Sequence, residues 1–433
     1  MAQKRIMGVA AVVSAAALIL AGCSSGGNAS TGNKIAGSIT VLTNRTDLID
    51  TAYKDYAKEF EKAYPGTTVK VEAIGDYEGE VKIRLNTKDF GDALFIPNSV
   101  TKNQLANFFE PLGTVDQLKG TYRFINEQAY QGKVYGIASI GSAHGLVYNT
   151  KVWAAAGITT LPKTPSEFID DLKLIKQKTG ATPYYTNYAG GWPLSKWENN
   201  SGMTGNPDEL NNLTTTDAPW APGQYHYIVD SLLYNIVHDG LSEKDPLTTN
   251  WEESKSLIGS GKVATMLLGS WSIVQMQDAA VKAGGSRTDI GYMPFPYQVN
   301  GKFFSTISSD YKDAVSKYSS NKATARAWVD WFAAKSNFAT TQGGLSPMLN
   351  GPTPDTLKDF AKTGVQFIEL NPAPAGKETL KSDIANGAEI DLGGNVYRQK
   401  LVDIARGAAP GDMTSYFAQL NKRWAAARAK VTG

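Results

Sequence analysis

The sequence contains almost no cysteine: Cys23 is the only one among 433 residues. A disulfide within the chain is therefore excluded, and so is a metal site built from clustered cysteines. Histidine is nearly as rare, with three residues, and no His-Glu-x-x-His motif is present. We therefore expect a fold stabilised by its hydrophobic core, with neither a resident metal ion nor a cofactor.

The chain also lacks an excess of charge of either sign. Its 43 Lys and Arg residues nearly balance its 41 Asp and Glu residues, which gives a net charge of +2. Removal of an N-terminal leader containing Lys4 and Arg5 would bring this charge to about zero. Binding to nucleic acid requires a basic face, so we expect no nucleic-acid partner. No apolar run after residue 21 approaches the length of a membrane span.

The N-terminus has the layout of an export signal. Lys4 and Arg5 precede the apolar run Ile6–Ala21, and "LAGC" (Leu20–Cys23) resembles the lipobox of bacterial lipoproteins. This resemblance implies a signal peptide over 1–22 and a lipid on the Cys23 thiol, which would hold the protein on the outer face of the cytoplasmic membrane. A buried free thiol is the other interpretation. The Ser/Gly-rich stretch that follows favours a lipidated tether over 23–37.

Strand and helix patterns alternate after the tether. The strands are expected at Ser38–Asn44, Thr68–Ile74 and Asp92–Pro97, with helices at Asp47–Tyr64 and Asp76–Leu85 between them. This order is typical of a parallel α/β sheet, whose functional loops follow the carboxyl ends of the strands.

The same alternation recurs in the second half. One helix has complete boundary signals: Thr164 as the cap, Pro165 at the first helical position, Glu167 completing a capping box and Gly180 ending it. The other expected elements are strands at His144–Asn149, Lys262–Gly269 and Asp289–Pro296, and helices at Val152–Ala156, Ser270–Ala283, Lys322–Ala334 and Met413–Lys430. Two α/β lobes account for both halves.

Polar side chains follow each of the first three strands. They are Asn44, Arg45 and Asp47 after the first strand, Asp76 and Tyr77 after the second, and Asn98 and Ser99 after the third. Asp47 or Thr46 is equally well explained as the cap of the next helix. Polar groups at three consecutive strand ends are nevertheless more than capping requires, and they indicate a binding site.

Aromatic residues cluster in polar loops of the second half. Trp192, Trp197 and Glu198 lie in a Gly-rich loop, and Trp271 directly follows a strand. Any single tryptophan here is as well explained by core packing. A sugar, however, needs aromatic rings for its C–H faces and fixed polar groups for its hydroxyls, so the combination indicates a carbohydrate ligand.

Several segments, taken in order, resemble one known family. They are "ITVLTN" (39–44), "GDALFIPNS" (91–99), "GKVYGIASIGSAHGLVYNTKVWAAAGI" (132–158), "TPSEF" (164–168), "GKVATMLLGSW" (261–271) and "IGYMPFP" (290–296). The chain is similar to family 1 extracellular solute-binding proteins, the maltose-binding-protein-like receptors of carbohydrate ABC importers.

The resemblance implies two α/β lobes of the periplasmic-binding-protein type with the ligand between them and closure about a hinge. Lobe 1 would comprise 38–145 and 304–350, and lobe 2 would comprise 146–303 and 351–433. The chain would cross between lobes near 142–148, 300–306 and 346–353. The resemblance further implies a monomer without catalytic activity that delivers a carbohydrate, such as an oligosaccharide, to membrane permease subunits.

Family positions also suggest individual contacts. Trp271 lies where family members commonly stack a sugar ring, and His144 at the first crossing is a hinge residue or a ligand contact. Ser309, Asp310 and Tyr311 follow the return crossing and complete the candidate set.

Two other functions stay open at this point. An exported carbohydrate-active enzyme would use carboxylates such as Glu198 or Asp310. A receptor for an anionic solute would use the Arg45 guanidinium, which can bind an anion through two hydrogen bonds.

Overall fold

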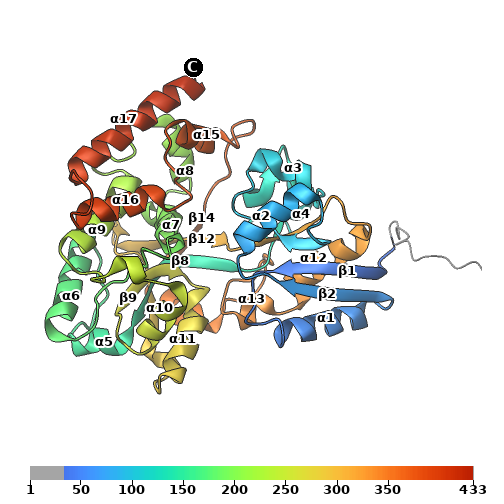
Figure 1. Ribbon diagram of the computed structural model, residues 1–433, viewed down its shortest axis with the longest axis horizontal. Coiled ribbons are helices and arrows are strands. Elements are labelled where there is room, and N and C mark those ends of the chain that lie inside the picture. The colour runs from blue at the N-terminus through green and yellow to red at the C-terminus, as the bar shows by residue number, and fades with distance from the viewer. Residues whose placement is uncertain (1–33, 433) are drawn as a thin grey trace, which may run out of the picture.

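The two larger of three β-sheets divide the described residues into two α/β lobes that lie side by side (Figure 1). The structure is a computed structural model, and it describes residues 34–432. The predicted signal peptide, Cys23 and most of the predicted tether lie outside the described residues. Within residues 34–432, no helix is both long and apolar enough to cross a membrane.

Lobe 1 contains a five-stranded sheet in the order β2-β1-β3-β13-β7. Its strands are β1 (Gly37–Thr43), β2 (Thr67–Ala73), β3 (Ala93–Phe95), β7 (Ile137–Ala138) and β13 (Lys312–Val315). The first three are parallel, as the sequence predicts, and β13 is antiparallel to β3. Residues of α1 (Ala52–Ala63) and α12 (Lys322–Lys335) form one core cluster with this sheet, and residues of α2 (Tyr77–Thr87) form another.

Lobe 2 is built around β8 (Gly141–Asn149), which pairs with three other strands. The remaining strands are β9 (Thr265–Gly269), β10 (Ile290–Met293), β11 (Gln298–Val299), β12 (Lys302–Ser309) and β14 (Gln366–Glu369). Its longer helices are α6 (Pro165–Lys178), α9 (Tyr225–His238), α10 (Trp251–Gly259), α11 (Ser272–Lys282), α16 (Val396–Ala405) and α17 (Met413–Thr432).

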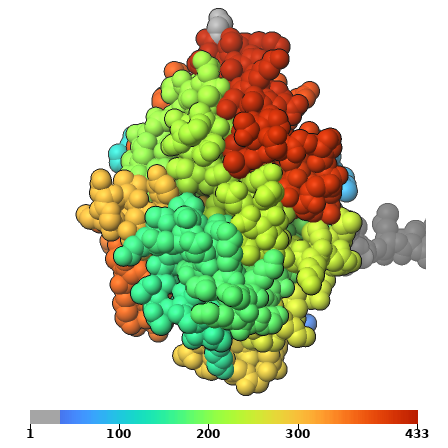
Figure 2. All heavy atoms as spheres, turned by 90° about the vertical axis from the view of Figure 1, so that its left-hand side faces the viewer, coloured from blue at the N-terminus to red at the C-terminus, as the bar shows by residue number. Residues whose placement is uncertain are grey.

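The closing helix α17 packs on lobe 2. Phe417, Leu420 and Trp424 are buried in the same core cluster as residues of α6 and α9, which confirms the expected position of this helix. Figure 2 shows the C-terminal segments covering the upper part of the outer face of lobe 2.

Two of the predicted crossings between the lobes fall within paired strands. β8 is paired from Gly141 onward, and β12 remains paired to Ser309, so the predicted boundaries at 145 and 304 fall inside strands of the second sheet. The sheets favour lobe boundaries near 140 and 310 instead. The third connection runs between α13 (Phe338–Thr341) in lobe 1 and the Phe360 region, which packs with lobe 2, and it includes the predicted range 346–353.

Local signals located the elements but not every boundary. The Thr164 side chain accepts a hydrogen bond from Glu167 N, as predicted, but the Glu167 carboxylate accepts from Lys163 N, so the predicted capping box is wrong in this detail. The first helix begins at Ala52 because the residues before it form turns, and α11 has Trp271 rather than Ser270 as its N-cap. The buried helix α9 was not anticipated.

Candidate functional site

The first strand of lobe 1 ends in an ion pair. β1 points toward lobe 2 (Figure 1), and Arg45 lies two residues beyond its end. The Arg45 guanidinium donates to both oxygens of Asp47, at 2.8 and 2.6 Å, and also donates to Gln342 Oε1 at 2.8 Å. Asp47 therefore holds Arg45 instead of capping α1.

The pKa of the Asp47 carboxyl responds to a charged group of lobe 2 as well as to Arg45. Burial alone would raise the pKa of the Asp47 carboxyl, but the Arg45 guanidinium and, from α10, the Lys255 ammonium lower it below its ordinary value. The loop after β1 is therefore within electrostatic reach of α10, and Asn44, half-buried, lies beside it.

The two predicted ligand contacts that follow the second strand lie in different environments. Asp76 is exposed and caps α2 by accepting from Gly79 N at 3.2 Å. Tyr77 is only 3% exposed, and its hydroxyl donates to Phe95 O at 2.9 Å. The structure thus places Tyr77 in the core of lobe 1, which corrects its assignment as a ligand contact.

Glu78, outside the predicted set, connects two loops that are distant in sequence. Its carboxylate accepts from the backbone N–H of Asn98 at 3.0 Å and from Asn98 Nδ2 at 2.9 Å. It also accepts from the Tyr311 hydroxyl at 2.9 Å. Glu78 therefore fixes the third strand end, where Ser99 is exposed, against the return crossing.

Three tryptophans form a cluster on lobe 2, which we call the tryptophan cluster. Trp192, Trp251 and Trp271 are each half-buried. The centroid of Trp192 is 5.0 Å from that of Trp251 and 5.8 Å from that of Trp271, and the centroids of Trp251 and Trp271 are 5.6 Å apart. Lys196 and Lys255 lie over the Trp192 and Trp251 rings, respectively. Partly exposed rings of this kind provide apolar faces for a ligand.

Trp251 was missed by the sequence reasoning. It occupies the first position of α10, after the cap Asn250, whose side chain accepts from Glu253 N. The Asn-Trp-Glu-Glu start of this helix is a signal for a helix N-terminus, but it carries no information that Trp251 meets Trp192 and Trp271.

Trp197 and Glu198 have structural roles in the core of lobe 2. Trp197 is 1% exposed. Glu198 Oε2 is 3.0 Å from both Arg398 Nη2 and His226 Nε2. Burial alone would raise the pKa of Glu198, but His226 and Arg398 lower it to about 2. Neither residue is available to a ligand, which corrects both assignments and removes Glu198 as a general acid.

His144 is also a structural residue. It lies within β8, is 5% exposed, and its Nε2 is 2.7 Å from Ser308 Oγ on the neighbouring strand β12. Burial, with smaller contributions from Lys196 and Lys312, lowers the pKa of His144 to about 3. The imidazole is therefore neutral at ordinary pH, and it supports the sheet of lobe 2 rather than contacting a ligand.

The return crossing carries a second, charged group of side chains. Glu127 accepts from Ser309 N at 2.9 Å and from Ser309 Oγ at 2.7 Å, and it forms an ion pair with Lys312 at 2.9 Å. Ser309 is thus already engaged, whereas Asp310 beside it is half-buried.

Lys102, which was not among the predicted site residues, is a further charged side chain near the return crossing. Its Nζ donates to Asn126 O at 2.9 Å. Burial lowers the pKa of Lys102, and the carboxylates of Glu127 and Glu378 oppose this decrease. Glu378 follows β14 in the chain, so Lys102 also lies within electrostatic reach of lobe 2.

Known proteins match this chain along most of its length. The family model of bacterial extracellular solute-binding proteins matches residues 45–337. Among solved structures, BlMnBP1 of Bifidobacterium animalis subsp. lactis, an ABC-transporter binding protein in complex with mannobiose, is 36% identical with a TM-score of 0.85, and the match covers 92% of this chain and 95% of that one. The manno-oligosaccharide-specific BlMnBP2 of the same organism, in complex with mannotriose, is 34% identical with a TM-score of 0.85, covering 92% and 96%. The diacetylchitobiose binding protein DasA of Streptomyces coelicolor is 24% identical over 96% of this chain and 98% of its own length.

Proposed function

Because this chain belongs to the bacterial extracellular solute-binding proteins, we propose that it captures a mannose-containing oligosaccharide between its two lobes and delivers it to the permease subunits of an ABC importer. The observation that carries this proposal is the tryptophan cluster on lobe 2, together with polar groups at the strand ends of lobe 1. The rings would stack on the C–H faces of the sugar, and the polar groups would bind its hydroxyls.

The choice of sugar rests on the relatives. The two binding proteins that are 34–36% identical to this chain were solved with mannobiose and mannotriose. Both span nearly the whole chain, so their ligands are better guides than those of relatives with lower identity. We propose mannobiose or mannotriose as the cargo, contacted by Trp192, Trp251 and Trp271 on one side and Asn44, Asp76 and Asn98 on the other.

Isothermal titration calorimetry of the purified protein tests this assignment. Mannobiose and mannotriose are titrated beside diacetylchitobiose and raffinose, and the sugar recovered afterwards is weighed by mass spectrometry. Tight binding of the manno-oligosaccharides, with their mass unchanged, is the expected result. Binding of diacetylchitobiose alone would contradict the cargo and leave the receptor role standing, and a cleaved sugar would identify an enzyme.

The anionic-solute alternative loses its main support in the structure. Arg45 is its only favourable feature in the sequence, and the Arg45 guanidinium is already bound by Asp47 and Gln342. A neutral ligand agrees better with this arrangement. The enzyme alternative loses one of its candidate carboxylates, because Glu198 is paired with Arg398.

The proposal includes attachment to the membrane through Cys23. A lipid on this thiol would keep a monomeric receptor at the outer face of the cytoplasmic membrane, close to its permease. Cell fractionation tests it: the wild-type protein is expected in the membrane fraction, and the Cys23→Ser variant in the medium or periplasm. Equal membrane association of both proteins would contradict lipidation.

A further inference from the structure

The three connections between the lobes meet at Gly141. Its backbone N–H donates to Leu345 O at 2.7 Å, and its carbonyl accepts from Leu345 N at 2.7 Å. On its other side Gly141 pairs with Ser309, the last residue of β12. The first connection therefore contacts both the second and the third at this residue, and a change in lobe orientation must alter the backbone around it.

The aromatic ring of Phe124 covers Gly141. A Cβ atom on Gly141 would lie 2.5 Å from Phe124 Cε2 and 3.0 Å from Leu345 Cβ, so only glycine fits beneath the ring. Phe124 comes from the loop between α4 (Val115–Leu118) and the 3-10 helix η2 (Ile125–Gln128) of lobe 1. It is 2% exposed and packs in the core cluster that contains Ala143 of lobe 2.

The backbone of Phe124 is in a conformation that a phenylalanine rarely adopts. Its φ is +62°, in the left-handed region that favours glycine. Such strain persists where the surrounding contacts determine it, and it concentrates at functional positions. The Phe124 N–H donates to Glu369 Oε1 of β14, at 3.2 Å, so the residue is also bonded directly to lobe 2.

The residues beside Phe124 hold the other connections, and we call Arg123–Glu127 the hinge bracket. Arg123 donates from its backbone N to Pro347 O at 2.8 Å and from Nη2 to Leu349 O at 2.9 Å. Glu127 binds the backbone N–H and hydroxyl of Ser309. One short segment of lobe 1 thus contacts all three connections.

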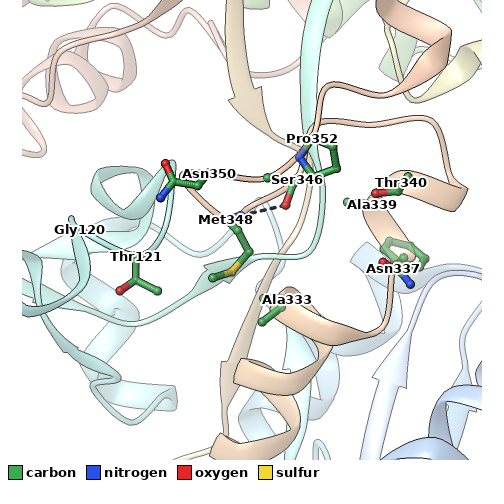
Figure 3. Close-up of a pocket in the computed structure, with 13 residues that line it drawn as sticks. Gly120, Thr121, Ala333, Asn337, Ala339, Thr340, Ser346, Met348, Asn350 and Pro352 are labelled. Carbon is green, nitrogen blue, oxygen red and sulfur yellow. Dashed lines mark hydrogen bonds between the residues drawn. The ribbon is translucent and has the colours of Figure 1, made fainter.

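A cavity of ≈ 350 Å³ flanks the third connection (Figure 3). Met348, Asn350 and Pro352 line it from the connection, and Ala333 and Asn337 line it from the end of α12 and the residues that follow. Because this space is unfilled by protein, packing on that side leaves the third connection room to shift. Hydrogen bonds to Arg123, Gly141 and Thr121 hold the third connection in place.

We propose that the hinge bracket, through Phe124 over Gly141 and the bond to Glu369, sets the angle between the lobes and so positions the two halves of the binding site. The inference rests on the proposed function only in that ligand capture involves lobe closure. Phe124 is buried and is not itself a proposed ligand contact, so it acts by changing the share of molecules in the binding-competent geometry.

Distances between the lobes in the ligand-free protein test the proposal. Fluorescent labels on Lys58→Cys in α1 and Lys282→Cys in α11, in a Cys23→Ser background, report the distance between lobes by single-molecule energy transfer; both side chains are exposed. The bracket variants are Phe124→Leu and Glu369→Met, the second of which removes the acceptor of the Phe124 N–H. The matched control is Phe109→Leu, which removes a ring of lobe 1 that is 1% exposed.

We expect a wider or shifted distance distribution in both bracket variants and an unchanged one in Phe109→Leu, although that control lowers the melting temperature. Affinity for mannotriose should weaken on the order of two- to thirtyfold in the bracket variants. Unchanged distributions in both would overturn the proposal. If Phe124→Leu does not fold, Glu369→Met, which keeps a side chain of similar length but lacks the acceptor, decides alone. Failure of the wild type to bind mannotriose would contradict the sugar assignment. The distances between the lobes are measured without ligand, so they would still test the role of the hinge bracket.

Discussion

The ring of Trp192 meets the ring of Trp251 edge to face, with centroids 5.0 Å apart and planes inclined by 70°. The two residues are brought together by α7 (Trp192–Ser195) and α10, and Trp271 at the start of α11 completes the cluster. Since the three rings pack on one another and stay partly exposed, each orients its neighbours. Loss of one ring should therefore affect the ligand both directly and through the others.

Replacing Trp251 by alanine should weaken manno-oligosaccharide binding by about 1–3 kcal/mol, because one large aromatic contact is lost. Trp271→Ala should have a similar effect, and titration calorimetry measures both. Trp331→Phe is the control, since Trp331 is 7% exposed in the lobe 1 core, outside the tryptophan cluster. Unchanged affinity in both alanine variants would remove the cluster from the binding site.

His144 should make the folded state less stable as the pH falls below about 6.5. Burial lowers the pKa of His144 in the folded protein to about 3, whereas an unfolded histidine titrates near 6.5. Between these values the unfolded chain binds a proton that the folded chain does not, so stability falls by up to about 1.4 kcal/mol per pH unit. Urea unfolding of wild type and His144→Gln at pH 7.5, 6.5 and 5.5 isolates this residue. Parallel stability curves would show that the pKa of His144 is not lowered in the folded protein.

Arg398→Met should destabilise the protein by about 3–5 kcal/mol. Arg398 is fully buried, its Nε is 2.9 Å from Asp230 Oδ1 and its Nη2 is 3.0 Å from Glu198 Oε2, so its removal leaves two buried carboxylates without their cation. Lys358→Met breaks an exposed ion pair with Asp355 and should change stability by less than about 0.5 kcal/mol. Chemical denaturation compares the two, and equal small effects would contradict the structural role of this buried network.

Gly141→Ala should destabilise the protein by about 1–3 kcal/mol, because its Cβ would overlap the Phe124 ring. In the Phe124→Leu background the same substitution should cost less, since the ring atoms that it meets are gone. The four proteins form a double-mutant cycle whose coupling energy is measured by unfolding. Gly180→Ala, where no atom lies within 4 Å of the new Cβ, is the control. If the effects of the two substitutions on the free energy of unfolding are strictly additive, Gly141 and Phe124 do not interact.

Raising the salt concentration should leave sugar affinity almost unchanged. The proposed ligand is neutral, and the Arg45 guanidinium is already occupied by Asp47. Titrations with mannotriose at 0.05 and 0.5 M sodium chloride test this expectation. A steep loss of affinity at high salt would instead indicate an ionic contact to the ligand.

The sequence was most informative where the pattern is local. Alternating apolar residues located β1 and β2, and Thr164 with Pro165 located the start of α6, because strand period and helix capping depend on neighbours a few residues away. The composition of the loops after the first three strands led to the prediction that Asn44, Asp76 and Asn98 contact a ligand. These residues lie at the surface of lobe 1 or near it, and their role stays a prediction.

Other residues could not be assigned without the fold. Trp197 and Trp271 look alike in the sequence, yet Trp197 is buried in the core and Trp271 belongs to the tryptophan cluster. Glu198 lies in a polar, Gly-rich loop, but its partner Arg398 is 200 residues away. No local pattern reports a contact at that separation.

The sequence by itself thus determined the α/β alternation and the family resemblance, and it predicted an export signal and the positions of the binding loops. The tertiary structure decided which side chains are available to a ligand and how the lobes are joined. The physical reason is that burial and pairing depend on segments that are distant in the chain: Phe124 lies over Gly141, and Trp251 meets Trp192, only once the chain has folded.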